Sequence, residues 1–208
     1  MIIAEKSITE NLSGVGAFIT KNGDPYSFLS ITEGRNSRKT NKLKGMTSAP
    51  FETIERGESH KDALRRVFAE TENGGQEEIT VVKGQISLPD DIKRAYLCKI
   101  QINPGIWLHA YLLSALPETT FAKGKDSDTI NEPRWVNIDQ VDNRQRFVFR
   151  PGMLEIIQSY RSYLEDPSNF DPQTYFTVAN SIPLRIYDSL DSGVSLEESL
   201  FQLVSAAE

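Results

Sequence analysis

Two apolar runs near the start of the chain predict a pair of β-strands. Residues 15–20 and 26–31 are rich in β-branched and aromatic side chains, and Asn22 and Gly23 lie between them. An Asn-Gly pair between two such runs is typical of a β-hairpin, because both residues tolerate the left-handed backbone of a tight turn. Later apolar runs predict the remaining strands, at 79–88, 94–102, 107–114 and 134–138.

Apolar residues recur at helical spacing in two other segments. The first helix is predicted after Ser59, a suitable N-cap, and should end at the Asn-Gly-Gly sequence of residues 73–75. Its apolar stripe consists of Ala63, Leu64, Val67, Phe68 and Thr71. The second helix is predicted over residues 153–164, and two short helices over 183–190 and 195–205.

The order of the predicted elements is strands, helix, strands, helix and a helical tail. This order favours an α+β fold over a doubly wound sheet, in which strands and helices alternate regularly. We expect one domain over residues 1–165 and a C-terminal helical extension over 166–208. A separate tail domain is disfavoured because residues 166–208 hold few apolar side chains.

Composition limits the classes of protein to which the chain can belong. The chain has 208 residues, 38% of them hydrophobic, and a formal net charge of −6, which favours a folded core and disfavours a nucleic-acid-coating role. Cys98 is the only cysteine, so it can form no disulfide within the chain. The longest apolar stretch, 106–116, is shorter than the about 20 residues that span a membrane. We therefore expect a cytoplasmic protein with neither membrane nor nucleic-acid partners.

The segment 34–45 is strongly basic. It contains no acidic residue and carries Arg35, Arg38, Lys39, Lys42 and Lys44. We expect a surface loop, which either steers a polyanionic ligand toward the protein or serves as a solvated connection.

Residues 50–75 resemble the Nudix box, the motif G-x5-E-x7-R-E-U-x-E-E-x-G-U, in which U is apolar. Glu58 takes the place of the first glutamate, and Arg66 follows it by eight residues. Phe68 takes the apolar position, and Glu70 takes the first place of the paired glutamates. Further similarity lies in Pro50 and Glu55 of the preceding loop and in the sequence Glu132-Pro133-Arg134-Trp135-Val136.

The resemblance covers residues 12–165 and implies an α/β/α sandwich with a mixed sheet. It also implies hydrolysis of a nucleoside diphosphate derivative with Mg²⁺ or Mn²⁺, because a pyrophosphate needs its charge neutralised and a water aimed at phosphorus. In the family, helix glutamates hold the metal ions and activate the water. The arginine and the first glutamate brace the loop against the helix through a charge-assisted pair.

The sequence departs from the Nudix box at the residues that hold metal. Val67 replaces the glutamate after the arginine, and Thr71 replaces the second of the paired glutamates. Phe51 and Glu52 replace two loop glycines, and Asn73 replaces the last glycine. Because residues 63, 67, 70 and 71 share one helix face, that face keeps a single carboxylate. Losing a general base or a metal ligand costs roughly 10²–10⁴ in rate.

Two function classes follow. In the first, the chain is an enzyme in which Glu70, Glu58 and Arg66 form the catalytic group. Its remade metal site uses Glu70, Glu52 and Glu55, and phosphate is bound by Arg38, Lys42 and Lys44. Further contributors to the metal site are His60, Asp126, Asp128 and Glu132. In the second, the chain is a non-catalytic module that binds a nucleotide-like ligand or a protein partner and needs no cofactor.

A third hypothesis is a structural domain whose tail mediates self-association, for example as a homodimer. The remaining chemistry-bearing side chains have ordinary explanations. His60 and His109 lack a partner at metal-ligand spacing, so each is expected at the surface or hydrogen-bonded in the core. Trp107, Trp135 and Cys98 are expected to be core residues.

Overall fold

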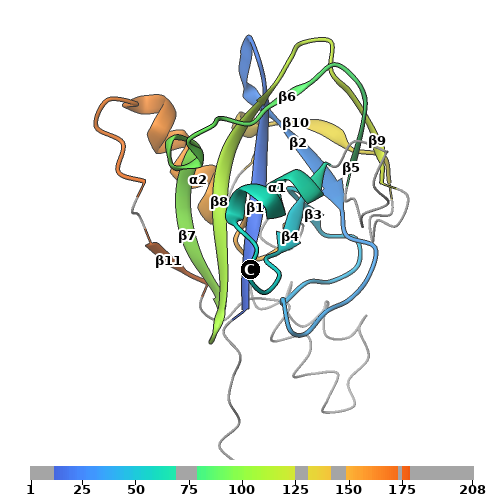
Figure 1. The fold of residues 1–208 in the computed structure, drawn as a ribbon, viewed down its shortest axis with the longest axis vertical. Helices are drawn as coiled ribbons and strands as arrows, with labels where there is room; N and C mark the ends of the chain where they lie inside the picture. Colours follow the sequence, from blue (N-terminus) through green and yellow to red (C-terminus); the bar gives the residue numbers. More distant parts are fainter. Residues whose placement is uncertain (1–11, 69–78, 125–130, 142–148, 173–174, 179–208) are drawn as a thin grey trace, which may run out of the picture.

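A mixed β-sheet forms the middle layer of the molecule (Figure 1). The computed structural model describes residues 12–68, 79–124, 131–141, 149–172 and 175–178. The strands lie in the order β10 (Arg134–Asn137), β2 (Asp24–Thr32), β1 (Leu12–Lys21), β8 (Ile106–Ala115), β7 (Tyr96–Asn103) and β11 (Tyr175–Thr177). The β1–β8 and β7–β11 pairs are parallel, and the other pairs in this row are antiparallel.

Short strands extend this sheet and form a second one. β3 (Thr47–Ser48) pairs with β2, β4 (Phe51–Thr53) with β1, and β6 (Ile86–Ser87) with β8. β5 (Ile79–Lys83) and β9 (Thr120–Lys123) form a separate two-stranded sheet. Two 3₁₀ turns, η1 (Ile92–Ala95) and η2 (Ile138–Gln140), precede β7 and follow β10.

The predicted first hairpin is confirmed, and one predicted strand is divided. β1 and β2 pair antiparallel on either side of Asn22 and Gly23, and Gly23 has a φ of 84°. The predicted strand 79–88 consists instead of β5 and β6, which belong to different sheets. Gly84 separates them with a φ of 82°, and a Cβ there would lie 2.7 Å from the Cα of Thr119, so a side chain at residue 84 would clash.

Helices cover both faces of the sheet. α1 (His60–Val67) lies in front of β1 in Figure 1, and α2 (Met153–Glu165) packs on the opposite face. Ser59 is the N-cap of α1, as predicted, and its Oγ accepts the N–H of Asp62. The helix ends at Val67, with Phe68 as its C-cap, which is earlier than the expected continuation to Thr71. The expected stop at 73–75 lies outside the described residues, as do the two predicted helices after residue 179.

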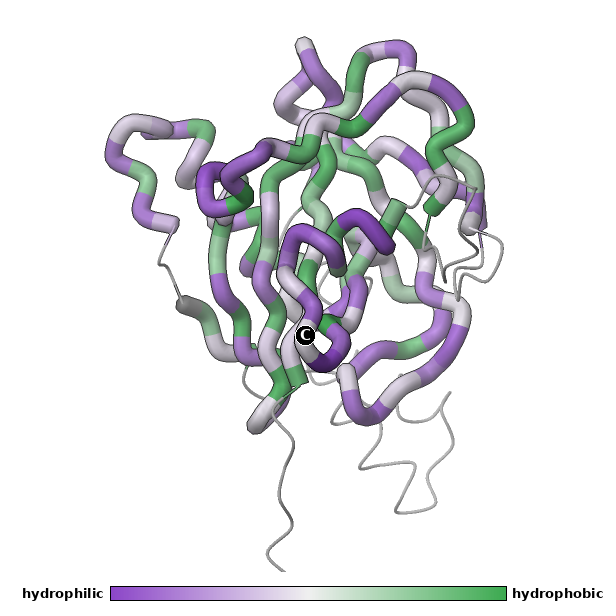
Figure 2. The backbone as a smooth tube through the Cα atoms, in the orientation of Figure 1, coloured by the Kyte–Doolittle hydropathy of each residue, from purple (hydrophilic) through white to green (hydrophobic). Residues whose placement is uncertain are grey.

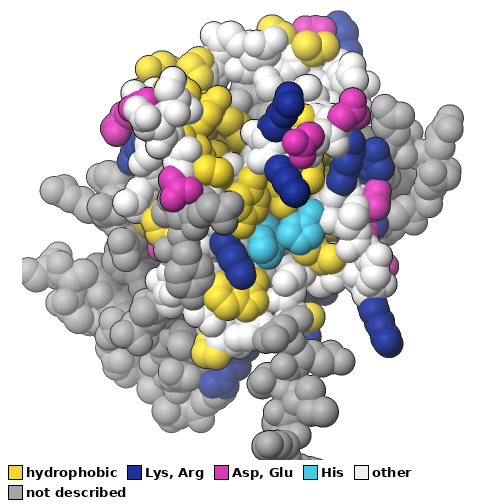
Figure 3. Space-filling view, turned by 60° about the vertical axis from the view of Figure 1, so that its left-hand side comes forward, with side chains coloured by type: hydrophobic (Ala, Val, Ile, Leu, Met, Phe, Trp, Pro, Cys, Tyr) yellow, Lys and Arg dark blue, Asp and Glu magenta, His cyan; other side chains and the backbone are white. Residues whose placement is uncertain are grey.

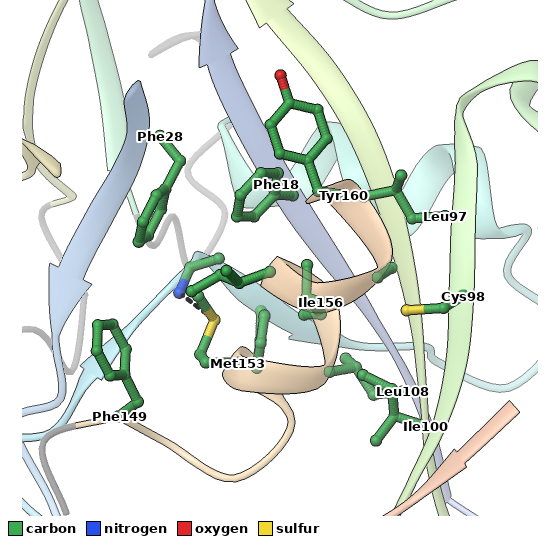
Figure 4. Packing of buried hydrophobic residues seen from close by; sticks show 14 of the residues in the cluster. Phe18, Phe28, Leu97, Cys98, Ile100, Leu108, Phe149, Met153, Ile156 and Tyr160 are labelled. Carbon is green, nitrogen blue, oxygen red and sulfur yellow. Dashed lines mark hydrogen bonds between the residues drawn. The ribbon is translucent and has the colours of Figure 1, made fainter. Parts of the chain in front are cut away.

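The core between α2 and the sheet, here the α2-side core, is built around stacked aromatic rings (Figure 4). The rings of Phe18 and Phe28 lie 5.0 Å apart, and Tyr160 packs on Phe18 at the same distance. Met153 reaches from α2 and accepts a hydrogen bond from the backbone N–H of Ala49 through its sulfur at 3.0 Å. Cys98 is buried in this core, as expected, and burial raises the pKa of its thiol to about 12.

A second core, the α1-side core, lies between α1 and the other face of the sheet. Val15, Ala17 and Ile19 of β1 contribute alternate residues to it, and α1 contributes Leu64 and Val67 among others. Because side chains on both faces of β1 are covered, the strand is buried without interruption from Val15 to Thr20. Figure 2 shows hydrophobic positions recurring along the central strands between more hydrophilic ones.

The sheet with a helix layer on each face confirms the expected α/β/α sandwich with a mixed sheet. The structure adds short strands that the hydrophobic pattern does not reveal, notably β9, which lies outside every predicted strand. No helix in the described part of the chain is long and apolar enough to cross a membrane.

Candidate functional site

Arg66 ties the loop before α1 to the helix. Its Nε donates to Glu58 Oε1 at 2.7 Å, and its Nη2 donates to Glu58 Oε2 at 2.8 Å. The same Nη2 donates to the backbone carbonyl of Thr53 in β4 at 2.6 Å. A two-pronged bond between guanidinium and carboxylate is strong and geometrically specific, so it fixes the path from β4 into α1. The Arg66–Glu58 pair that the Nudix resemblance implies is therefore present.

Two more carboxylates face the same guanidinium. Glu52 Oε1 and Glu55 Oε1 each lie 3.5 Å from Arg66 Nη1. The hydrogen bond from Arg66 lowers the pKa of Glu58 below its ordinary value. Burial raises the pKa of Glu52, although Arg66 and the backbone N–H of Thr53 act in the opposite direction. Three glutamates thus surround one arginine.

Val67, which the resemblance to the Nudix box aligns with a metal-binding glutamate, is fully buried. Its relative exposure is 0%, and it packs in the α1-side core beside Ala63 and Leu64. A carboxylate in this place would lose its hydration without gaining a partner among the surrounding apolar side chains. The helix face that the box uses for metal is therefore, at this residue, part of the core.

The described residues on their own do not fit a Mg²⁺ site. Among them, no group of three or more His, Cys, Asp or Glu side chains is arranged to hold a metal ion. Glu52 and Glu55 lie against the positive charge of Arg66, which competes with a cation for their oxygens. Glu132 accepts the backbone N–H of Lys123 at 2.7 Å. The other proposed contributors from the sequence, Glu70, Asp126 and Asp128, lie outside the described residues.

Comparison with known proteins identifies the fold. No family model and no curated protein matches the sequence. Solved structures do match, among them a NUDIX hydrolase from Nitrosomonas europaea with a TM-score of 0.53 and 11% identity, over 81% of this chain and 79% of that one. The chain has the Nudix fold. A structure from Jonesia denitrificans described as a possible asymmetric diadenosine tetraphosphate hydrolase matches with a TM-score of 0.52 and 12% identity, over 74% and 94% of the two chains.

The basic segment 34–45 of this Nudix fold is only partly a surface loop. Lys42 is buried, and its Nζ lies 2.7 Å from Glu33 Oε2, with side-chain exposures of 8% and 2%. Arg150 Nη1 donates to the other oxygen of Glu33 at 2.8 Å. The expectation that Lys42 lies at the surface is wrong, because it forms an ion pair with Glu33, a buried acid that directly follows β2. Arg38 and Lys44 are exposed.

A further cluster of functional side chains lies on the α1 face of the Nudix sheet. This His–Tyr cluster consists of His60, His109, Tyr96 and Tyr111. The two imidazole rings lie 4.6 Å apart between centroids, and Figure 3 shows them side by side at the surface, with hydrophobic and basic side chains around them.

The sequence reasoning missed this cluster because its members come from three elements. His60 opens α1, Tyr96 opens β7, and His109 and Tyr111 lie on β8. The alternation of Trp107, His109 and Tyr111 places these three on one face of β8, which was a usable signal. The approach of His60 depends on how α1 docks on the sheet, and spacing along the chain does not encode that.

Proposed function

We propose that this Nudix-fold chain binds a nucleotide-like small molecule and does not hydrolyse it. The observation that carries the proposal is the full burial of Val67 in the α1-side core, at a position where a Nudix hydrolase has a metal-binding glutamate. The scaffold is retained, since Arg66 and Glu58 still brace the loop against the helix. Their bond would be structural in an active hydrolase too, so it supports a retained fold without supporting turnover.

The charges around Arg66 give further support. One guanidinium is shared by Glu52, Glu55 and Glu58, so each of these carboxylates already has a positively charged neighbour. Mg²⁺ dehydrates reluctantly and prefers several hard oxygen ligands in octahedral geometry. A cation entering here would have to separate Glu52 and Glu55 from Arg66, which adds a cost that a pre-formed metal site lacks.

For ligand binding, we assign the phosphate contacts to Arg38 and Lys44. Both are exposed in the basic segment, on a chain whose net charge is −6, so they concentrate positive potential locally. Lys42 would act indirectly, because its bond to Glu33 anchors the same segment. Neither a nucleic acid, a membrane nor a metal cofactor is part of this proposal, and a cytoplasmic location agrees with it.

A second candidate is Mg²⁺- or Mn²⁺-dependent pyrophosphohydrolysis, and the state of Glu52 favours it. Its carboxyl is largely buried, its pKa is raised by burial, and it lies farther from Arg66 than Glu58 does, at 3.5 Å against 2.7 Å. A poorly paired, desolvated carboxylate of this kind is typical of functional sites. In this candidate Glu70, Glu52 and Glu55 would hold the metal ion, which would neutralise the pyrophosphate.

One experiment separates the two candidates. The protein is incubated with ADP-ribose, diadenosine tetraphosphate and deoxynucleoside triphosphates, with Mg²⁺ or Mn²⁺, and released phosphate and monophosphate are measured. In parallel, the melting temperature is measured with each nucleotide in the presence of a chelator. The proposal expects a melting-temperature increase without turnover, since a ligand that binds only the folded state stabilises it.

Four variants make the experiment decisive. Metal-dependent turnover that is lost in Glu70→Gln and reduced in Glu52→Gln would establish the hydrolase and overturn the proposal. Arg38→Gln and Lys44→Gln should each reduce the ligand-induced melting-temperature increase. A melting temperature that no nucleotide changes would overturn the binding proposal as well.

A further inference from the structure

The His–Tyr cluster holds both histidines by the same ring nitrogen. His60 Nδ1 lies 2.5 Å from Tyr111 Oη, and His109 Nδ1 lies 3.0 Å from Tyr96 Oη. Among the described residues, neither imidazole Nε2 has a hydrogen-bond partner. Two rings from different elements are thus held in orientation by tyrosines, and their Nε2 atoms can hydrogen-bond to a ligand.

The hydrogen bonds from the two tyrosines determine which nitrogen of each imidazole ring can carry the proton. Burial raises the pKa of Tyr96 to about 12 and also raises the pKa of Tyr111, so both hydroxyls keep their protons at neutral pH. Each hydroxyl can donate to the Nδ1 that it contacts, and in the described part of the chain it has no other hydrogen-bond acceptor. A neutral imidazole that accepts at Nδ1 carries its proton on Nε2. When both tyrosines donate, the cluster presents two N–H donors; a tyrosine that instead accepts from Nδ1–H would leave that ring with an Nε2 acceptor.

A lysine lies on the same face of the sheet as His109. Lys99 is the cross-strand partner of His109 in the β7–β8 pair, and its Nζ lies 4.2 Å from the centroid of the Trp107 ring. The charge of Lys99 contributes to lowering the pKa of His109, after burial and the neighbouring His60. Among the described residues, no carboxylate contributes to the pKa shift of either histidine.

We propose that His60, His109 and Lys99 form a binding site for a phosphoryl group. Two N–H donors and an ammonium group without a carboxylate partner suit a compact anion with several acceptor oxygens. The site lies where α1 meets β7 and β8, and it shares no residue with the phosphate contacts of the proposed function, Arg38 and Lys44 of the segment 34–45. The inference is therefore independent of the proposed function and goes beyond it.

A divalent metal ion is the competing occupant, because imidazole is a common metal ligand. Binding through Nε2 would require both rings to move their protons to Nδ1 and donate them to the tyrosines. It would also place a divalent charge near the ammonium group of Lys99, with two protein ligands from the described residues. Both conditions oppose a cation and favour an anion.

The test follows the histidine rings directly. Proton–nitrogen NMR of the imidazole groups is recorded at pH 7 and constant ionic strength while inorganic phosphate or adenosine monophosphate is added. The expected result is a protonated Nε2 in both rings without ligand and a saturable shift of both Nε2 signals on addition. Tighter binding of adenosine monophosphate would identify a nucleotide as the source of the phosphoryl group, and equal binding would identify free phosphate.

Matched lysine variants provide the control. Lys99→Gln should weaken binding about tenfold, the typical effect of losing a charge-assisted hydrogen bond. Lys83→Gln, which removes the same charge from an exposed position on β5, should leave binding unchanged. The inference is overturned if no saturable shift occurs, if both variants weaken binding equally, or if Zn²⁺ shifts the Nε2 signals and phosphate does not.

Discussion

At the scale of single residues, the buried charges are what sequence patterns describe least well. Glu33 has 2% exposure and receives hydrogen bonds from Lys42 and Arg150, which lie 9 and 117 residues away along the chain. Burial alone would raise the pKa of Glu33, but the two cations outweigh it and lower the pKa below its ordinary value. The acid is therefore ionised and holds two basic residues in the interior.

This arrangement makes Glu33 a strong stability determinant. Replacing it with alanine removes the carboxylate that Lys42 and Arg150 share, and we expect the free energy of unfolding to fall by about 3–5 kcal/mol. Lys44→Ala, at an exposed position in the same segment, should change it by less than about 0.5 kcal/mol. Urea denaturation of both variants measures the difference, and comparable losses would contradict the assigned roles.

His109 gives a second prediction at this scale. Burial, His60 and Lys99 lower its pKa to about 4, from an ordinary value of 6.5. Between these pH values His109 is protonated in the unfolded chain and neutral in the folded chain. The free energy of unfolding should therefore decline as pH falls from 6.5 toward 4. His109→Gln should show a shallower decline in denaturation measurements between pH 7 and pH 4. Identical slopes for the two proteins would show that His109 titrates normally.

Residues that act on near neighbours in the chain were predictable, and those that act across the fold were not. Ser59 as N-cap followed from the local sequence, and the Arg66–Glu58 pair followed from the resemblance to the Nudix box; in both cases the partners lie within eight residues. The burial of Lys42 and the pairing of His60 with His109 depend on strand register and helix docking. Local spacing contains no information on either.

At the scale of elements, α1 combines a charged outer side with an apolar inner side. Its outer side retains Arg66, while Leu64 and Val67 on its inner side pack against the sheet. The hydrophobic stripe predicted this inner side correctly for the described residues. It could not foresee β9 or β11, because strands of three or four residues exist only through pairing with a partner.

Restoring the glutamate of the Nudix box should damage this helix. Val67→Glu places a carboxylate among apolar side chains, and we expect a loss of about 3–5 kcal/mol in the free energy of unfolding. Val67→Ala serves as the control and should cost about 2 kcal/mol, since it only removes buried methyl groups. Thermal and urea denaturation compare the two. A glutamate variant as stable as the alanine variant, with newly gained Mg²⁺ binding, would show that this position is open to a metal ion.

At the scale of the whole molecule, the parallel pairing of β1 with β8 is the central organising contact. It joins residues more than 90 positions apart, such as Leu12 and Ile106. Hydrophobic periodicity indicated the strands but not their order, whereas the resemblance to the Nudix box implied the sandwich that the structure shows. The chain beyond α2 continues this architecture, because β11 pairs with the far edge of β7 and the backbone N–H of Val178 donates to Gln101.

The boundary predicted at residue 165 can be tested through β11. Phe170, Phe176 and Val178 pack against the α2-side core, so the chain after α2 contributes to that core as well as to the sheet. A protein that ends at residue 165 would expose the edge of β7 and lose these contacts. We expect its melting temperature to fall by about 5–10 °C, corresponding to about 2–3 kcal/mol of lost burial, with increased self-association through the open edge.

A second truncation, after residue 178, is the matched comparison. It keeps β11 and removes only residues 179–208, so its melting temperature should stay within about 2 °C of that of the full chain if those residues do not contribute to the fold. Thermal denaturation and light scattering of the three proteins give the answer. Equal melting temperatures for all three would show that β11 adds nothing, and the domain would then end at 165. If mass in solution halves only when 179–208 are removed, those residues mediate a homodimer.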